Sequence, residues 1–190
     1  TVMNFKYAMI VMLLAGVTLG GCLSTKSDEG KDSVLGIYNV RQVVADNNKI
    51  SRTVMWSSKA KQNDYELELR LQGDKKLIPY KAKDYSFKDG KGEYIQYGSL
   101  LTDLKAGEKY EYRINQGKAK GSWHKLKADN GKNFKAIIYP DTQCSDYSFW
   151  HKVSIPAYER NKDVDLYLHL GDLTDNGEDN YQWEQWFKGV

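Results

Sequence analysis

The stretch YELELRL, residues 65–71, decides the fold of the first half of the chain. Its apolar residues alternate strictly with charged ones, so every second side chain is apolar. Successive side chains of a β-strand point to opposite faces, and this pattern therefore predicts a strand with one buried face. YEYRI, residues 110–114, alternates in the same way and predicts a second strand of this kind.

Similar short segments lie on both sides of this stretch and are separated by turn residues such as Asn47-Asn48 and Gly73-Asp74. Six or seven short strands with such punctuation favour a β-sandwich, which we place at residues 34–128. The further strand candidates are 37–44, 52–58, 77–83 and 93–101.

The segment LTDLKAGEKYEYRI, residues 101–114, resembles the corner between the fifth and sixth strands of a fibronectin type III-like sandwich. Leu104, Gly107 and Tyr110 occupy the places of a tyrosine corner, in which the tyrosine hydroxyl bonds back to the preceding backbone. Trp56 then fits the large central side chain of the core better than a residue that stacks on a sugar.

The pattern changes after Phe134. FKAIIYP (134–140) and VDLYLHLG (164–171) are continuous apolar runs, typical of strands covered on both faces in a parallel sheet. The segment between them has helical spacing, with Ser145 or Asp146 as N-cap and a kink or break expected at Pro156. We therefore expect a right-handed strand–helix–strand unit, with the boundary to the sandwich at residues 128–132.

Carboxylates follow both of these predicted strands. Asp141 comes after the first and Asp172 after the second, so both should project from the same edge of the sheet. Neighbouring strands lie about 4.8 Å apart, which suits carboxylates that hold two metal ions about 3.5 to 4 Å apart. Gly171 permits a sharp turn, and Asn176 and Gly177 close the loop before a new helix.

These blocks carry a family resemblance. YPDTQ (139–143) followed by GDLTDNGEDNYQW (171–183) resembles the opening blocks of calcineurin-like metallophosphoesterases, and the sandwich is similar to the N-terminal domain of purple acid phosphatases. The resemblance covers about residues 36–190. It implies a multidomain chain: a fibronectin type III-like sandwich (34–128), then the first βαβ part of an α/β metallophosphoesterase domain (133–190).

The resemblance also implies an activity and a ligand set. The activity is hydrolysis of phosphoric esters with two divalent or trivalent ions of Fe, Zn or Mn. Asp141 would bind the first ion and Asp172 would bridge both, whereas Gln143 stands where many members have a histidine ligand. Asp175 stands where purple acid phosphatases have a metal-bound tyrosine, and we expect it to shape the loop through backbone hydrogen bonds.

The family's Asn-His pair and its two later histidine motifs do not occur before Val190. The printed chain is therefore expected to be an inactive N-terminal fragment, and its catalytic residues stay unassigned. His124, His151 and His169 are more typical of structural roles than of metal ligands. Cys144 is more typical of a small filling side chain.

Two other functions remain open. One is a cell-envelope binding module, in which the sandwich recognises a glycan or a protein and the acidic loops are ordinary turns. The other is a single calcium site made of Asp141, Asp172 and Asp175, because calcium needs only oxygen ligands. Nucleic acid is not an expected partner, since the net charge of +3 is spread along the chain without a basic stripe.

The first residues have the order of a secretory leader. Lys6 precedes the apolar run 7–20, and LGGC at 19–22 resembles a bacterial lipobox, in which Cys22 is diacylated. We expect a lipoprotein signal at 1–22, a flexible tether at 23–33 and a protein anchored by lipid in the bacterial cell envelope, facing away from the cytoplasm. The alternatives are an ordinary cleaved signal or a short buried helix.

Overall fold

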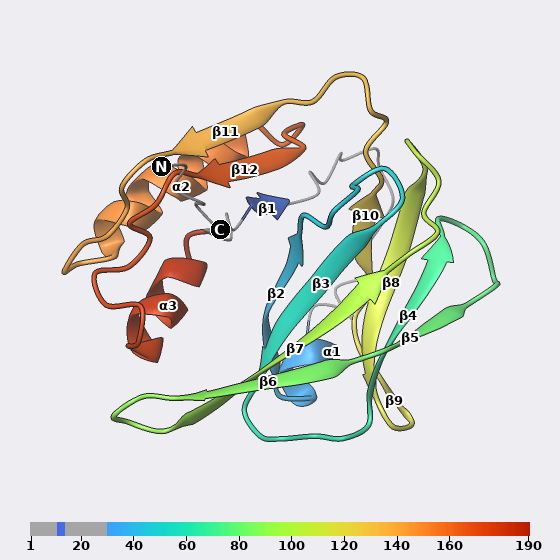
Figure 1. The fold of residues 1–190 in the computed structure, drawn as a ribbon, viewed down its shortest axis with the longest axis horizontal. Helices are drawn as coiled ribbons and strands as arrows, with labels where there is room; N and C mark the ends of the chain where they lie inside the picture. Colours follow the sequence, from blue (N-terminus) through green and yellow to red (C-terminus); the bar gives the residue numbers. More distant parts are fainter. Residues whose placement is uncertain (1–10, 14–29) are drawn as a thin grey trace, which may run out of the picture.

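The computed structural model describes residues 11–13 and 30–190, and most of its regular structure is β-sheet. One sheet has the strand order β11-β12-β1-β2-β3-β7-β6; the other has the order β10-β8-β4-β5, with β9 added to β8. Figure 1 shows the two sheets and the helices of the second half beside them. The strands are β1 (Val11–Leu13), β2 (Ile37–Val43), β3 (Arg52–Ser58), β4 (Tyr65–Leu71), β5 (Ile78–Lys81), β6 (Lys83–Lys88), β7 (Glu93–Leu101), β8 (Lys109–Gln116), β9 (Ala119–Lys120), β10 (His124–Lys127), β11 (Ala136–Tyr139) and β12 (Leu166–His169).

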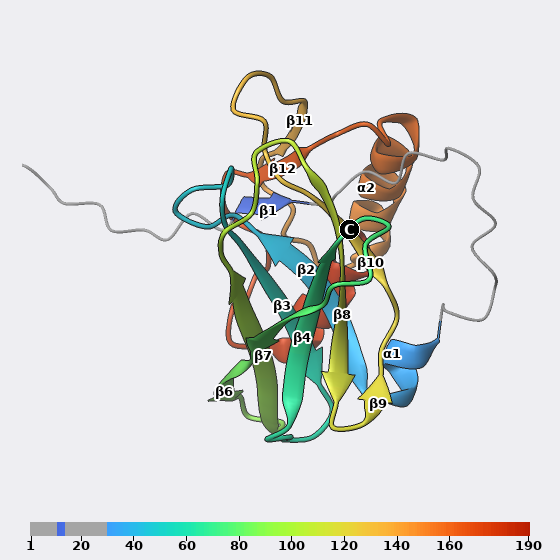
Figure 2. The same cartoon turned by 90° about the vertical axis from the view of Figure 1, so that its right-hand side faces the viewer.

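One apolar core lies between the two sheets of residues 34–128, as the prediction of a β-sandwich requires. Its members alternate with exposed or half-buried residues, and they come from β2, β3 and β7 on one side and from β4, β8 and β10 on the other. Figure 2 views this part with β4 and β8 in front of β2 and β3. The pairings among these strands are antiparallel, which suits a sheet with one buried and one solvated face.

Aromatic side chains fill the centre of this core. Trp56 is completely buried, stacks on Tyr97 with ring centroids 5.7 Å apart and meets Tyr65 edge-on at 5.8 Å. Its prediction as a core residue is confirmed. The Tyr110 hydroxyl accepts a hydrogen bond of 2.8 Å from the backbone N–H of Lys105, so the expected tyrosine corner is present.

The sequence predicted most strands of the sandwich but missed one at its edge. The candidates 52–58, 65–71 and 93–101 correspond to β3, β4 and β7. The edge strand β6 was not expected, because KDYSFK is rich in charged residues and its side chains are mostly exposed. It is defined by its pairing with β7 instead.

The second half contains two parallel strands and two helices. β11 and β12 pair in parallel, with Ile137 opposite Tyr167 and Tyr139 opposite His169. Helix α2 (Ser148–Arg160) lies between them in sequence, and α3 (Asn180–Phe187) follows β12, as expected for a helix after Gly177. A second apolar cluster joins these elements; its buried members are Tyr139, Tyr147, Trp150, Val164, Tyr167 and Trp186.

The expectation that both faces of these strands are covered is wrong for the described residues. Tyr139 and Tyr167 pack into the second cluster, but Ile138 is 56% exposed on the other face and Leu170, just beyond β12, is 65% exposed. A continuous apolar run does not reveal how many layers cover a sheet. Here the buried cluster collects only the alternate residues on one face.

Helix α2 does not break at Pro156, one of the two outcomes predicted there. It continues through Pro156 without a break, with Trp150 and Ser154 of the preceding turns buried in the cluster. Tyr147 stands at the N-cap position without a capping side chain. Asp146 does the capping from one residue earlier, since its carboxylate accepts hydrogen bonds from the backbone N–H and the hydroxyl of Ser148.

β1 lies between β12 and β2 and makes one continuous sheet from the strands of both halves. It falls within the apolar run predicted as a leader; the rest of the predicted signal, including Cys22, lies outside the described residues. Helix α1 (Lys31–Val34) begins within the predicted tether. Among the helices of the described ranges, none has the length and hydrophobicity needed to cross a membrane.

Candidate functional site

The loops that follow β11 and β12 are joined by backbone hydrogen bonds. The carbonyl of Asp172 accepts from the N–H of Thr142 at 2.9 Å and from that of Gln143 at 2.8 Å. The N–H of Leu170 bonds the carbonyl of Tyr139 at 2.9 Å, which extends the pairing of the strands. The structure therefore brings the loops of Asp141 and Asp172 together at one edge of the sheet.

The chain turns sharply between β12 and this contact. Gly171 has φ +126, a conformation that only glycine adopts easily, and Asp172 has φ +50 in the left-handed region. A non-glycine residue held there costs on the order of 1 kcal/mol or more. This turn directs the Asp172 carbonyl to the two N–H groups of the neighbouring loop.

The carboxylates of Asp141 and Asp172 are exposed. Within the described ranges, neither forms a hydrogen bond or an ion pair through its carboxylate, and both act electrostatically on His169. Gln143 is exposed as well, and its backbone N–H is what joins it to Asp172. The site thus presents two carboxylates of the same charge, and no cationic side chain of the described residues pairs with them.

His169 contacts residues of both loops. Its side chain is buried, with Nε2 2.8 Å from the Thr142 hydroxyl and Nδ1 accepting from the Gly171 N–H at 3.2 Å. Burial lowers the pKa of His169, and this effect outweighs the opposing influence of Asp141 and Asp172. The ring is therefore neutral, with its proton on Nε2, and both nitrogens are occupied. This agrees with the expected structural role.

The Thr142 hydroxyl connects His169 to helix α3. It accepts a second hydrogen bond, of 2.9 Å, from the indole Nε1–H of Trp186, and its oxygen lies 3.4 Å from the carbonyl of Leu173. One hydroxyl thereby links β12, the loop after β11, the loop after β12 and α3. Neither Thr142 nor Trp186 was expected at the site, although both lie close to the quoted motifs in the sequence.

The remainder of the aspartate loop is held by α3. The Gln182 side-chain oxygen accepts from the Asn176 N–H at 2.9 Å, and the Trp183 indole donates to the carbonyl of Gly177 at 2.8 Å. Asn176 also accepts from the N–H of Glu178 at 3.0 Å. Asn176 and Gly177 therefore shape the loop as expected.

Asp175 behaves differently from its prediction. Its carboxylate makes no hydrogen bond with any described residue, so the side chain does not shape the loop in the expected way. Its backbone forms a hydrogen bond with the hydroxyl of Tyr147. Burial raises the pKa of Tyr147, and this hydrogen bond opposes the increase. Asn176 performs the shaping that we expected of Asp175.

The other candidate side chains have structural contacts. His124 pairs with Asp32 at 2.6 Å in the sandwich, and His151 bonds the carbonyl of Gln185 at 2.7 Å. Both have the structural roles that were expected. Cys144 is free and packs against the second apolar cluster, in agreement with its interpretation as a filling side chain.

The side chains at the edge are of a type that binds metal ions, but there are few of them. Unpaired carboxylate oxygens are the ligands that hard cations prefer, and two exposed carboxylates of the same charge repel one another. Within residues 11–13 and 30–190, however, no group of three or more His, Cys, Asp or Glu side chains is placed to hold one ion. The three aspartates of the calcium hypothesis are thus not brought together there.

Comparison with known proteins adds little. No protein-family model and no curated protein matches the chain. Among solved structures, the chain is similar to Astrotactin-2, described as a conserved vertebrate-specific and perforin-like membrane protein involved in neuronal development. The identity is 11% and the TM-score 0.37, over 63% of this chain. The chain spans about a quarter of that protein, since 24% of it is covered.

Proposed function

We propose that this chain belongs to a metal-dependent hydrolase of phosphoric esters and that Asp141 and Asp172 bind its metal. The observation that carries the proposal is the pair of joined loops beyond β11 and β12. Each presents an exposed carboxylate with no partner in the described part of the chain. Such a position beyond the carboxyl ends of parallel strands is where α/β sheets bind ligands.

Charge explains why a cation belongs in this proposal. A phosphoric ester is an anion, and two carboxylates without a counter-ion repel it. A cation held by Asp141 and Asp172 reverses the sign of the edge and lets the phosphate approach. When bound, such an ion supplies an acidified water and stabilises charge on the phosphoryl oxygens. We take Fe, Zn or Mn as the candidate ions, two of them according to the family resemblance.

The residues of the chain itself have positioning roles in this proposal. The left-handed turn at Asp172 and its carbonyl bonds to Thr142 and Gln143 keep the two loops in fixed register. Neutral His169, buried beneath, adds no positive charge that would compete with the cation. The same proposal includes membership in the calcineurin-like family. It also includes a fibronectin type III-like sandwich and a lipid anchor in the bacterial envelope.

The test is metal content, which is measured without turnover. The wild-type chain and its Asp141→Asn, Asp172→Asn and Asp175→Asn variants are reconstituted with Mn²⁺, Zn²⁺ or Fe²⁺ and measured by elemental analysis. We expect Asp172→Asn to bind least metal, because it removes the proposed bridging ligand. Asp141→Asn should mainly lose one ion.

Asp175→Asn is the matched control, since it removes one charge from the same loop without touching the pair. It should retain nearly the wild-type metal content. Where hydrolysis of aryl phosphate mono- and diesters is detected, Asp172→Asn should abolish it. Full metal content in Asp172→Asn would overturn the proposal and favour the envelope binding module.

A further inference from the structure

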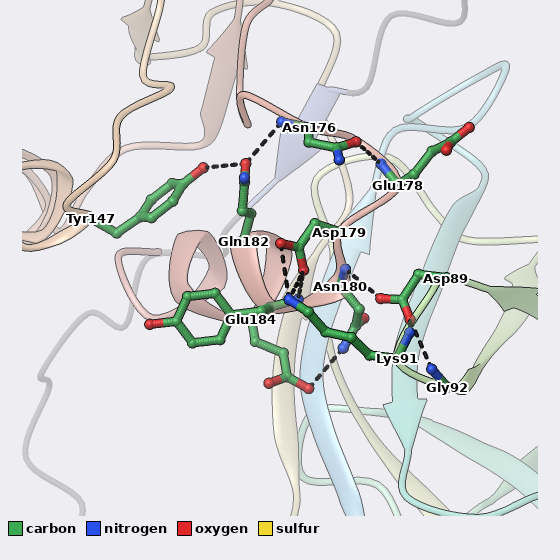
Figure 3. A network of polar contacts seen from close by, with 11 residues as sticks. Asp89, Lys91, Gly92, Tyr147, Asn176, Glu178, Asp179, Asn180, Gln182 and Glu184 are labelled. Carbon is green, nitrogen blue, oxygen red and sulfur yellow. Dashed lines mark hydrogen bonds and ion pairs between the residues drawn. The ribbon is translucent and has the colours of Figure 1, made fainter.

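The tip of the β6–β7 hairpin contacts the first turn of α3, although the two are far apart in sequence. Lys91 Nζ lies 3.0 Å from Oδ1 and 3.2 Å from Oδ2 of Asp179. Asp89 accepts a hydrogen bond of 3.1 Å from the backbone N–H of Asn180. Figure 3 shows the side chains of Asp89 and Lys91 converging on the start of this helix.

Asp89 links the hairpin turn to the start of α3. The other carboxylate oxygen of Asp89 accepts from the backbone N–H groups of Lys91 at 2.7 Å and of Gly92 at 2.9 Å. One side chain thus fixes the turn from which Lys91 extends and also bonds the helix. The turn and the helix start therefore behave as one polar unit.

The start of α3 in turn holds the aspartate loop. Asp179 is the N-cap residue, and its Oδ1 accepts from the N–H of Tyr181 at 3.0 Å. One turn later, Gln182 accepts from the Asn176 N–H at 2.9 Å and from the Tyr147 hydroxyl at 3.2 Å. These bonds, drawn in Figure 3, connect the hairpin to the loop that begins at Asp172.

We propose that Lys91 is a positioning residue of the sandwich that holds α3, and through it the loop 172–179, in the conformation that presents Asp172. This inference rests on the proposed function only for its consequence, metal binding. The positioning itself is a property of the chain and is measured without metal. A sandwich residue thereby acts on the candidate site of the second half.

Hydrogen exchange of the metal-free 190-residue chain tests the positioning directly. Lys91→Met removes the charge that holds Asp179, whereas Asp179→Asn removes the ion pair and retains an N-cap side chain. An exposed ion pair holds its surroundings modestly, so each variant should speed exchange in peptides covering 172–179 by about threefold to fivefold. The double variant should exchange no faster than either single one, because both changes remove the same contact.

Controls separate positioning from a general loss of stability. Lys88→Met removes the neighbouring hairpin pair with Glu93, which lies 3.7 Å away and does not reach α3, so loop exchange should stay at the wild-type rate. Lys91→Arg should restore slow exchange, because it keeps the charge. The unfolding temperature should be the same in all of these variants. Unchanged loop exchange in Lys91→Met, or additive effects in the double variant, would overturn the proposal.

Metal binding then distinguishes this inference from the proposed function. If the wild-type chain binds Mn²⁺, Lys91→Met should weaken its affinity about threefold to fivefold and Lys91→Arg should not. Unaltered affinity in Lys91→Met would refute the consequence for the site. If the wild-type chain binds no Mn²⁺ while loop exchange responds to Lys91, the proposed function fails and the positioning stands.

Discussion

Replacing Thr142 with valine tests whether its hydroxyl organises the candidate site. Valine has nearly the same shape, so the change removes the hydrogen bonds and preserves the packing. Two buried donors, the His169 Nε2–H and the Trp186 Nε1–H, then lose their acceptor. The exposed fractions of these two side chains are 8% and 3%, so water cannot readily replace the hydroxyl.

The magnitude follows from the desolvation of these groups. A buried donor without a partner costs about 1 to 3 kcal/mol, so the two together should lower the free energy of unfolding by about 2 to 6 kcal/mol. Thr142→Ser is the matched control, because it keeps the hydroxyl and loses one methyl group, worth about 0.8 kcal/mol. Urea denaturation followed by tryptophan fluorescence measures both. Equal stability of the valine and serine variants would refute the role of the hydroxyl.

Three further predictions concern buried groups. Burial lowers the pKa of folded His169 from 6.5, so the unfolded chain takes up the proton first as the pH falls. The free energy of unfolding should be full above about pH 6.5 and should fall as the pH drops through the lowered pKa. In urea titrations at several pH values, His169→Gln should reduce this dependence on pH. Arg52 is completely buried, its Nε and Nη1 are unpaired, and burial lowers its pKa to about 10. Arg52→Met should therefore leave thermal stability unchanged or raise it, and a loss above about 2 kcal/mol would contradict this. Tyr110→Phe should cost about 1 kcal/mol in urea, because the N–H of Lys105 loses its acceptor, and wild-type stability would argue against the corner.

The sandwich could be predicted because its information is local. In β4, the alternation of apolar and charged residues indicates which face is buried, so the strand can be predicted without knowing its partner strands. The missed strand β6 shows the limit of this reasoning. Tyr85 and Phe87 alternate with polar residues, but the run is short, charged and mostly exposed, and its pairing with β7 is what defines it as a strand.

The candidate site divides in the same way. Asp141 and Asp172 could be placed at one edge because each follows a predicted strand. The parallel pairing of these strands puts their carboxyl ends at the same edge of the sheet. The contacts below them depend on how α3 packs. The Trp186 indole reaches Thr142 from 44 positions along the chain, and no spacing rule in the sequence anticipates this. The contact between Lys91 and Asp179 spans 88 positions and was hidden for the same reason.

Other aspartates of the chain show what an ordinary structural aspartate does. The carboxylates of Asp89, Asp146 and Asp179 each accept backbone N–H groups near them in sequence, which is the usual use of aspartate in turns and helix caps. Asp141 and Asp172 follow their strands in similar loops, yet in the described part of the chain their carboxylates accept no such bond. A carboxylate whose role was to shape its loop would be bonded to that loop. These two stand in a loop pair fixed by backbone bonds and leave their oxygens available, which the proposed role of metal ligand requires.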